Sequence, residues 1–175
     1  MPQRAPVAVH ILMVEDDPGD VAYARDVFED HKVHNRLTAV PDGLQALACL
    51  RREGRFAGGP PVDVILLDLN LPGIDGRGVL NLIKADPALA PIPLVLLTNS
   101  LLDQRMLSDL QLPADMYMQK PLDFERLVQL VRRFDDFYFS VERVFTDPRL
   151  ALEDQVMRAR RWRFILHPEG HQALL

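Results

Sequence analysis

Residues 61–76 read PVDVILLDLNLPGIDG, a stretch that constrains the fold more strongly than any other part of the chain. Its apolar run extends from Val62 to Leu67, is interrupted only by Asp63, and leads directly into Asp68. A short run that is apolar at almost every position is typical of a strand with both faces buried, as in a parallel sheet. Proline and glycine flank the run and predict a break on either side. We therefore expect a buried strand with a carboxylate at its carboxyl end.

Four further apolar runs alternate with amphipathic segments, which predicts five strand–helix units. The other runs are Val9–Val14, Leu37–Val40, Leu94–Leu97 and Met116–Met118. Helical patterns lie near residues 20–31, 43–53, 76–86, 101–111 and 123–144. Such units imply an α/β fold, in which a doubly wound parallel sheet is covered by helices on both faces. In sheets of this kind, ligands bind beyond the carboxyl ends of the strands.

The composition narrows the class of protein. The chain has 175 residues, a net charge of −5 and 48% hydrophobic residues, which suits one globular domain with a small appendage. The acidic balance argues against DNA as the main partner. Cys49 is the single cysteine, so no internal disulfide can form, and no stretch approaches the ~20 apolar residues of a membrane helix. Residues 1–9 do not resemble a secretory signal, so we expect a soluble cytoplasmic protein.

The pattern also divides the chain. We expect an N-terminal tail at residues 1–8, a domain at 9–145 and a C-terminal extension at 146–175. The last helix of the domain is expected to be unusually long, and the extension is expected to contain one more helix near 149–163. An extension of ~30 residues is too short for an independent output domain.

Acidic residues follow two of the predicted strands. The first strand runs into Glu15 and Asp16 and the third into Asp68, and these ends converge if the two strands are neighbours. Clustered carboxylates repel one another unless a cation lies between them. Mg²⁺ prefers oxygen ligands and shares its shell with phosphate oxygens, and the backbone carbonyl of Asn70 would supply one more oxygen. The simpler alternative is that these acids only cap the helices that follow.

A hydroxyl and an ammonium group follow two other strands. The fourth strand ends at Thr98 and the fifth at Lys120. A hydroxyl can donate a hydrogen bond to a phosphoryl oxygen, and a lysine can neutralise a phosphoryl charge of roughly −2. Together with the acids, these residues predict a phosphoryl-transfer site in which Asp68 is the nucleophile.

Four segments resemble the signature of bacterial response-regulator receiver domains. They are ILMVEDD at 11–17, VILLDLNLPGIDG at 64–76, VLLTNS at 95–100 and YMQKP at 117–121. They occur in the order of the family over about residues 8–133, and it is the combination that is specific. The resemblance implies a flavodoxin-like fold with strand order 2-1-3-4-5 and a bound Mg²⁺ ion.

The resemblance assigns roles to the motif residues. It makes Asp68 the phosphoacceptor. It makes the metal ligands Glu15, Asp16, Asp68 and the backbone carbonyl of Asn70. Asp17 adjoins the acidic pair but does not correspond to a ligand.

The remaining motif residues would contact the phosphoryl group or change conformation when it is present. By the resemblance, Thr98 and Tyr117 are the switch residues and Lys120 contacts the phosphoryl group. Two positions depart from the family pattern, because Asn99 stands where a small residue is usual and Pro113 where glycine is usual. Asn99 puts the lifetime of the phosphorylated state in question, and Pro113 implies a stiffer loop before the fifth strand.

The implied function is that of a single-domain response regulator. It would accept a phosphoryl group from a sensor histidine kinase, promote its own phosphorylation and dephosphorylation without being a conventional enzyme, and signal by a change of shape. Alternatives are a phosphate sink or relay intermediate without its own output, and an aspartyl-phosphate phosphatase. The phosphatase would need an aspartate two residues after the nucleophile, where this chain has Asn70.

The end of the predicted domain is unusually aromatic. Four residues there are candidates for a homodimer face between the fourth and fifth helices: Phe134, Phe137, Tyr138 and Phe139. An extended aromatic last helix also resembles the small receivers that serve bacterial phytochrome kinases. A bacteriophytochrome is therefore the expected kinase, and neither DNA nor a membrane is an expected partner.

Overall fold

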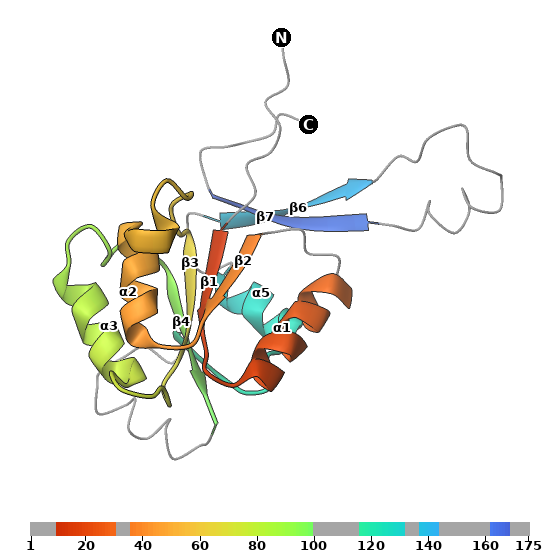
Figure 1. Cartoon of the computed structure of the whole chain (residues 1–175). Coiled ribbons are helices and arrows are strands. Elements are labelled where there is room, and N and C mark those ends of the chain that lie inside the picture. The colour runs from red at the N-terminus through yellow and green to blue at the C-terminus, as the bar shows by residue number, and fades with distance from the viewer. Residues whose placement is uncertain (1–9, 31–35, 100–115, 132–136, 144–161, 169–175) are drawn as a thin grey trace, which may run out of the picture.

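The strands and helices alternate along most of the chain (Figure 1). The computed structural model describes residues 10–30, 36–99, 116–131, 137–143 and 162–168. The strands are β1 His10–Val14, β2 Arg36–Val40, β3 Val64–Asp68, β4 Leu94–Thr98, β5 Tyr117–Gln119, β6 Phe137–Arg143 and β7 Trp162–Pro168. The helices are α1 Pro18–Asp30, α2 Gly43–Arg51, the short 3₁₀ helix η1 Gly54–Phe56, α3 Gly76–Ala85 and α5 Phe124–Val131. The helix expected at 101–111 lies outside the described residues.

The first five strands form one parallel sheet. Their order is β2-β1-β3-β4-β5, which confirms the predicted order 2-1-3-4-5. Every residue of β1, β3 and β4 is buried, so the near-continuous apolar runs arise because both faces of these strands are covered. After β1 the chain forms β2 on one side of it and then crosses to β3 on the other side, so the direction of the strand order reverses between β1 and β3, whose ends lie side by side.

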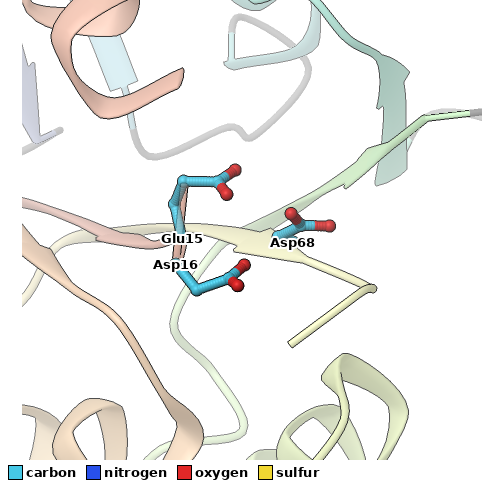
Figure 2. A group of neighbouring side chains, drawn as sticks. All are labelled: Glu15, Asp16 and Asp68. Atoms are coloured by element: carbon cyan, nitrogen blue, oxygen red, sulfur yellow. The ribbon is translucent and has the colours of Figure 1, made fainter. Parts of the chain in front are cut away.

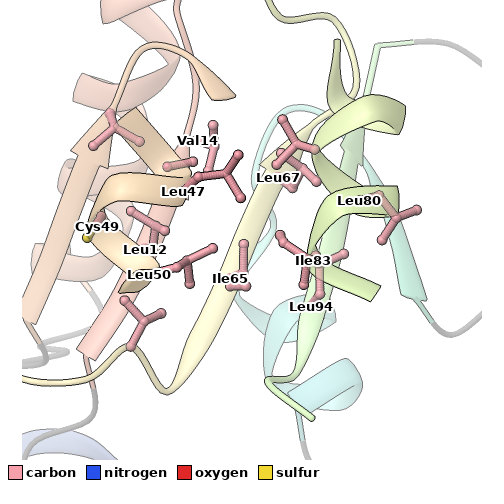
Figure 3. Packing of buried hydrophobic residues seen from close by; sticks show 14 of the residues in the cluster. Leu12, Val14, Leu47, Cys49, Leu50, Ile65, Leu67, Leu80, Ile83 and Leu94 are labelled. Carbon is pink, nitrogen blue, oxygen red and sulfur yellow. The ribbon is translucent and has the colours of Figure 1, made fainter. Parts of the chain in front are cut away.

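Two apolar cores lie on the two faces of the sheet. Figure 1 shows α2 and α3 on one face and α1 and α5 on the other. Successive residues of a strand contribute alternately, so that Leu12 and Ile65 pack in the first core while Met13 and Leu66 pack in the second. Figure 3 shows the first core, in which side chains of α2 and α3 meet the strands. The sheet is thus fixed from both sides, which makes its carboxyl edge a rigid support. In the part of the chain that the structure describes, no helix has the length and apolar content to span a membrane.

The expected long last helix is wrong in part. Helix α5 is described only as far as Val131, and residues 137–143 form a strand, β6, that pairs antiparallel with β7. The sequence of β6, FYFSVER, is rich in aromatic and β-branched residues, which favour strands when a partner strand is available. The prediction of a helix near 149–163 is also wrong at its C-terminal end, because β7 begins at Trp162. Residues 144–161 lie outside the described part, and the proposed division of the chain at 145 stays a prediction.

Candidate phosphoryl-transfer site

The carboxyl ends of β1 and β3 bring three acids together. Val14 and Leu67 are neighbours in the parallel register, so the residues that follow them, Glu15 and Asp68, emerge at the same edge. One carboxylate oxygen from each of Glu15, Asp16 and Asp68 lies within 4.8 Å of the others. Figure 2 shows the three carboxylates converging on one small space. The sequence predicted this convergence, and simple helix capping does not account for it, since none of these three side chains caps a helix.

The neighbouring acid Asp17 has a different role. Its Oδ1 atom accepts a hydrogen bond of 2.7 Å from the backbone N–H of Gly19 and so caps the start of α1. The backbone N–H of Asp17 donates to Oε1 of Glu15 over 3.0 Å, which helps to orient that carboxylate. Asp17 thus orients Glu15 and caps α1, and its exclusion from the metal ligands stays a prediction.

The loop after β3 holds Asp68 in place. The backbone N–H of Asn70 donates to Oδ1 of Asp68 over 2.9 Å. A Cβ atom at Gly76 would lie 2.3 Å from the carbonyl oxygen of Asp68, so only glycine permits α3 to start this close to the strand. Gly73, with φ 75°, adopts the left-handed conformation that glycine tolerates. The Pro-Gly-Ile-Asp-Gly sequence therefore folds the chain back tightly beneath the nucleophile.

Lys120 lies at the centre of the site. Its Nζ atom is 2.5 Å from Oδ2 of Asp68, 2.5 Å from Oε2 of Glu15 and 2.8 Å from Oδ2 of Asp20. Its backbone N–H donates to the carbonyl of Thr98 over 2.7 Å, which ties the lysine to the end of β4. Sequence reasoning did not identify Asp20, which belongs to the first turn of α1 and has no counterpart in the motif.

The pKa values of Glu15 and Lys120 are both raised, but for different reasons. Burial raises the pKa of Glu15, and the nearby charge of Asp68 raises it further, although the hydrogen bonds from Lys120 and Asp17 act against the shift. Burial by itself lowers the pKa of Lys120, but its hydrogen bonds to Asp20, Asp68 and Glu15 outweigh burial and raise the pKa above the usual value. Lys120 is therefore a fixed positive charge at neutral pH.

Thr98 lies at the carboxyl end of β4, beside the end of β3. The residue is fully buried, and its Oγ1 atom has no hydrogen-bond partner among the described residues. Burying a hydroxyl without a partner costs free energy, so such a group calls for an explanation. Tyr117, the other predicted switch residue, starts β5, pairs in register with Leu96 and is partly buried against the first core. Asn99 is exposed.

The acidic cluster fits a hard divalent cation. The donor set is all oxygen, and Asp16 is exposed while Glu15 and Asp68 are buried, so a bound ion would keep waters on one side. Asn70 belongs to an adjoining open pocket of about 570 Å³, which gives access to the cluster from solvent. The pocket is lined by Asp16, Leu69, Asn70, Leu71, Pro72, Asp75 and Arg77.

The candidate dimer residues fall in a different element from the one expected. Phe137, Tyr138 and Phe139 are the first residues of β6, and Phe134 lies outside the described residues. Pro113 and the rest of the segment 100–115 also lie outside them, so the expected face between a fourth and a fifth helix has no described counterpart.

Comparison with known families places this geometry in context. Residues 11–132 match the response regulator receiver domain, and the chain belongs to that family. Rcp1, a response regulator of Synechocystis sp., is 35% identical over 130 residues, which span 74% of this chain and 88% of Rcp1. The chain is thus similar to a stand-alone receiver over nearly the whole length of that protein.

Solved structures of response regulators are also similar to this chain. The bacteriophytochrome response regulator AtBRR is 31% identical with a TM-score of 0.69, covering 74% of this chain and 94% of AtBRR. The phosphorylated cyanobacterial phytochrome response regulator RcpA is 36% identical with a TM-score of 0.59, covering 74% of this chain and 92% of RcpA. The Mn²⁺-bound form of Rcp1 is 35% identical with a TM-score of 0.57, covering 73% of this chain and 91% of that one.

Proposed function

We propose that this chain is a response regulator that accepts a phosphoryl group on Asp68 from a sensor histidine kinase. One observation carries the proposal: at one edge of the sheet lie a buried carboxylate, a lysine ammonium 2.5 Å from it, and a buried hydroxyl that has no hydrogen-bond partner in the described part of the chain. A phosphoryl group on Asp68 would bring oxygens for the hydroxyl of Thr98 and for the ammonium of Lys120. The family match and the phosphorylated and metal-bound relatives support the same chemistry.

The chain's own residues account for the transfer step. A carboxylate oxygen of Asp68 attacks the phosphorus of a phosphohistidine, the new O–P bond forms as the P–N bond breaks, and the electron pair returns to the leaving imidazole. Lys120 donates to the equatorial oxygens and offsets their developing charge. Glu15, Asp16, Asp68 and the carbonyl of Asn70 would hold Mg²⁺, which supplies further charge neutralisation at those oxygens.

Thr98 and Tyr117 would convert the new group into a change of shape. The hydroxyl of Thr98 would move toward a phosphoryl oxygen, and the partly buried ring of Tyr117 would follow into the space that this movement leaves. Such a switch needs a bias of only a few kcal/mol between two states. The receiver would then act on a target, or it would serve as a sink or relay for phosphoryl groups without an output of its own.

The transfer is tested directly by intact mass. The protein is incubated with acetyl phosphate, with Mg²⁺ or with EDTA, and we expect a hydroxylamine-labile gain of one phosphoryl group only with Mg²⁺. Asp68→Asn should abolish the gain, whereas Asp26→Asn, which changes an exposed acid of α1, should leave it unchanged. Mg²⁺-dependent labelling of the Asp68→Asn protein would disprove the assignment of the phosphoacceptor.

The kinase proposed as the partner is a bacteriophytochrome. Several similar structures are phytochrome response regulators, and the chain covers 94% and 92% of two of them. Incubating the receiver with an autophosphorylated bacteriophytochrome, and with an unrelated histidine kinase at the same concentration, compares the two donors. The proposal requires faster transfer from the bacteriophytochrome.

We also propose that the protein is a homodimer through the ribbon of β6 and β7. Alternate residues of a strand share one face, and antiparallel partners lie on the same face. The register pairs Phe139 with Leu166 and Val141 with Phe164, so these apolar positions fall on one face. An isolated two-stranded ribbon is marginal in water, and an apolar face that a second copy covers would stabilise it.

Light scattering tests the dimer. The wild-type protein should have twice the monomer mass, and Phe139→Asp should shift it toward the monomer. Ser140→Asp changes the neighbouring position, which falls on the opposite face of the ribbon, and should keep the dimer. A monomeric mass for the wild type, with and without a phosphoryl mimic, would refute this part of the proposal.

A further inference from the structure

Lys120 has one partner that the proposed metal site does not explain. Two of its three carboxylate partners, Glu15 and Asp68, belong to the acidic cluster, but the third, Asp20, does not. The distance from Nζ of Lys120 to Oδ2 of Asp20 is 2.8 Å, and the two residues are 100 positions apart in the chain. This contact therefore depends on the fold and links α1 to the end of β5.

The start of α1 holds Asp20 in position. Asp17 caps the helix through the N–H of Gly19, and the N–H of Val21 donates to the carbonyl of Asp17 over 3.1 Å. The side chain of Asp20 is 40% exposed, whereas that of Lys120 is 10% exposed. Asp20 thus approaches the ammonium from the solvent side, and Glu15 and Asp68 approach it from the buried side.

The ammonium group of Lys120 can donate only a limited number of hydrogen bonds. An ammonium group has three N–H donors and no acceptor. Nζ of Lys120 donates hydrogen bonds to Asp20 and Asp68, while Glu15 contacts it as an ion-pair partner. A cation among Glu15, Asp16 and Asp68 would compete for two of the three partners, and a phosphoryl group on Asp68 would require a donor from Lys120. The contact with Asp20 is the one that neither event needs to break.

We propose that Asp20 is a positioning residue that anchors the ammonium of Lys120 while its other partners change. This inference rests on the proposed phosphoryl transfer. Asp20 holds the nitrogen within reach of the oxygens on Asp68, so that the lysine meets the incoming phosphoryl group without first losing conformational freedom. It acts through Lys120 and does not touch the phosphoryl group.

Three substitutions distinguish anchoring from a simple effect of charge. Asp20→Asn removes the charge but keeps an oxygen acceptor of the same shape, Asp20→Ala removes both, and Asp26→Ala removes an exposed acid of the same helix as a matched control. If Asp20 is an anchor, the asparagine protein should lie between the wild type and the alanine protein. If only its charge matters, the asparagine and alanine proteins should behave alike, and the proposal is wrong.

The first measurement needs neither metal nor phosphate. In ¹⁵N NMR spectra of the metal-free protein, a hydrogen-bonded Lys120 ammonium should exchange its protons slowly enough to give a resolved signal. Asp20→Ala should increase that exchange by about tenfold, the change expected when a charged hydrogen bond is lost. An exchange rate equal to that of the wild type would overturn the proposal, whatever the outcome of phosphorylation.

The second measurement is the rate of labelling by acetyl phosphate at saturating Mg²⁺. Asp20→Ala should slow it by about tenfold and Asp20→Asn by less, with Asp26→Ala unchanged. Urea unfolding of each variant shows whether the fold is intact. Failure of the wild type to be labelled at all would refute the proposed function, whereas normal labelling of Asp20→Ala would refute only the anchor.

Discussion

Thr98, at the end of β4, has a buried hydroxyl group. The residue is 0% exposed, and its Oγ1 atom has no partner among the described residues. Leaving such a group unpaired costs about 1–3 kcal/mol. The proposed function gives this hydroxyl a partner, a phosphoryl oxygen on Asp68.

Thr98→Val should therefore have opposite effects on the two states. Valine has nearly the shape of threonine without the unpaired hydroxyl, so we expect the free energy of unfolding of the resting protein to rise by about 1 kcal/mol in urea. The same variant should bind beryllofluoride, a phosphoryl mimic, more weakly, as followed by the mimic-induced shift in melting temperature. Thr98→Ser keeps the hydroxyl and serves as the control for binding. Equal binding by the valine and wild-type proteins would show that the hydroxyl does not face the phosphoryl group.

The sequence predicted the positions of some site residues but not of others. Glu15, Asp16 and Asp68 could be placed together because the carboxyl ends of parallel strands share an edge, and the structure places them there. Asp20 could not, since its contact with Lys120 depends on the direction in which the first turn of α1 leaves β1. Local patterns predict strand ends well, but they do not predict which side chain of a helix crosses back over the site.

At the scale of single elements, the starts of α2 and α3 are each determined by the residue that directly precedes the helix. Asp42 precedes α2 in an extended conformation, and its Oδ1 atom accepts a hydrogen bond of 2.8 Å from the N–H of Gln45. That hydrogen bond lowers the pKa of the Asp42 carboxyl, although partial burial opposes the shift. Asp75 caps α3 in the same way through the N–H of Gly78.

Removal of the cap at Asp42 should weaken the fold without affecting the site. Asp42→Ala is expected to lower the free energy of unfolding by about 1 kcal/mol in urea at pH 7, whereas Asp42→Asn, which keeps an acceptor, should lose less. Because folding lowers the pKa of Asp42 below 3.8, its contribution is present above that pH and is lost as the pH falls through the folded-state pKa. The difference between the wild type and Asp42→Asn should accordingly shrink in strong acid. A difference that does not depend on pH would show that the charge of the cap is unimportant.

The C-terminal elements show where local patterns fail. Residues 137–143 continue an amphipathic pattern from α5, and the sequence alone favoured one long helix there. The structure instead pairs them with residues 162–168, a partner that begins 19 positions after β6 ends. Short segments with both aromatic and apolar residues are compatible with a helix or a strand, and a distant partner decides between the two. No local signal reveals such a partner.

At the scale of the whole molecule, the two cores fix a sheet whose carboxyl edge concentrates negative charge. Burial raises the pKa of Glu15 above its usual value of 4.5, so folding disfavours the charged form. A carboxyl group whose pKa is raised by folding contributes stability at low pH that is lost as the pH rises through the folded-state pKa. At neutral pH the buried carboxylate of Glu15 therefore lowers the stability of the folded protein.

A divalent cation should relieve this instability, which makes the global stability a measure of the site. Because Mg²⁺ would bind the folded chain and not the unfolded one, a concentration one hundred times its Kd should add about 2.7 kcal/mol to the free energy of unfolding at pH 7. Asp16→Asn removes an exposed ligand of the cluster and should lose most of that gain, whereas Asp42→Asn, an acid at the start of α2, should keep it. The measurement is thermal unfolding across a Mg²⁺ titration. An equal gain in Asp16→Asn and in the wild type would mean that Mg²⁺ only screens the net charge of −5, and the acidic cluster would then not be a metal site.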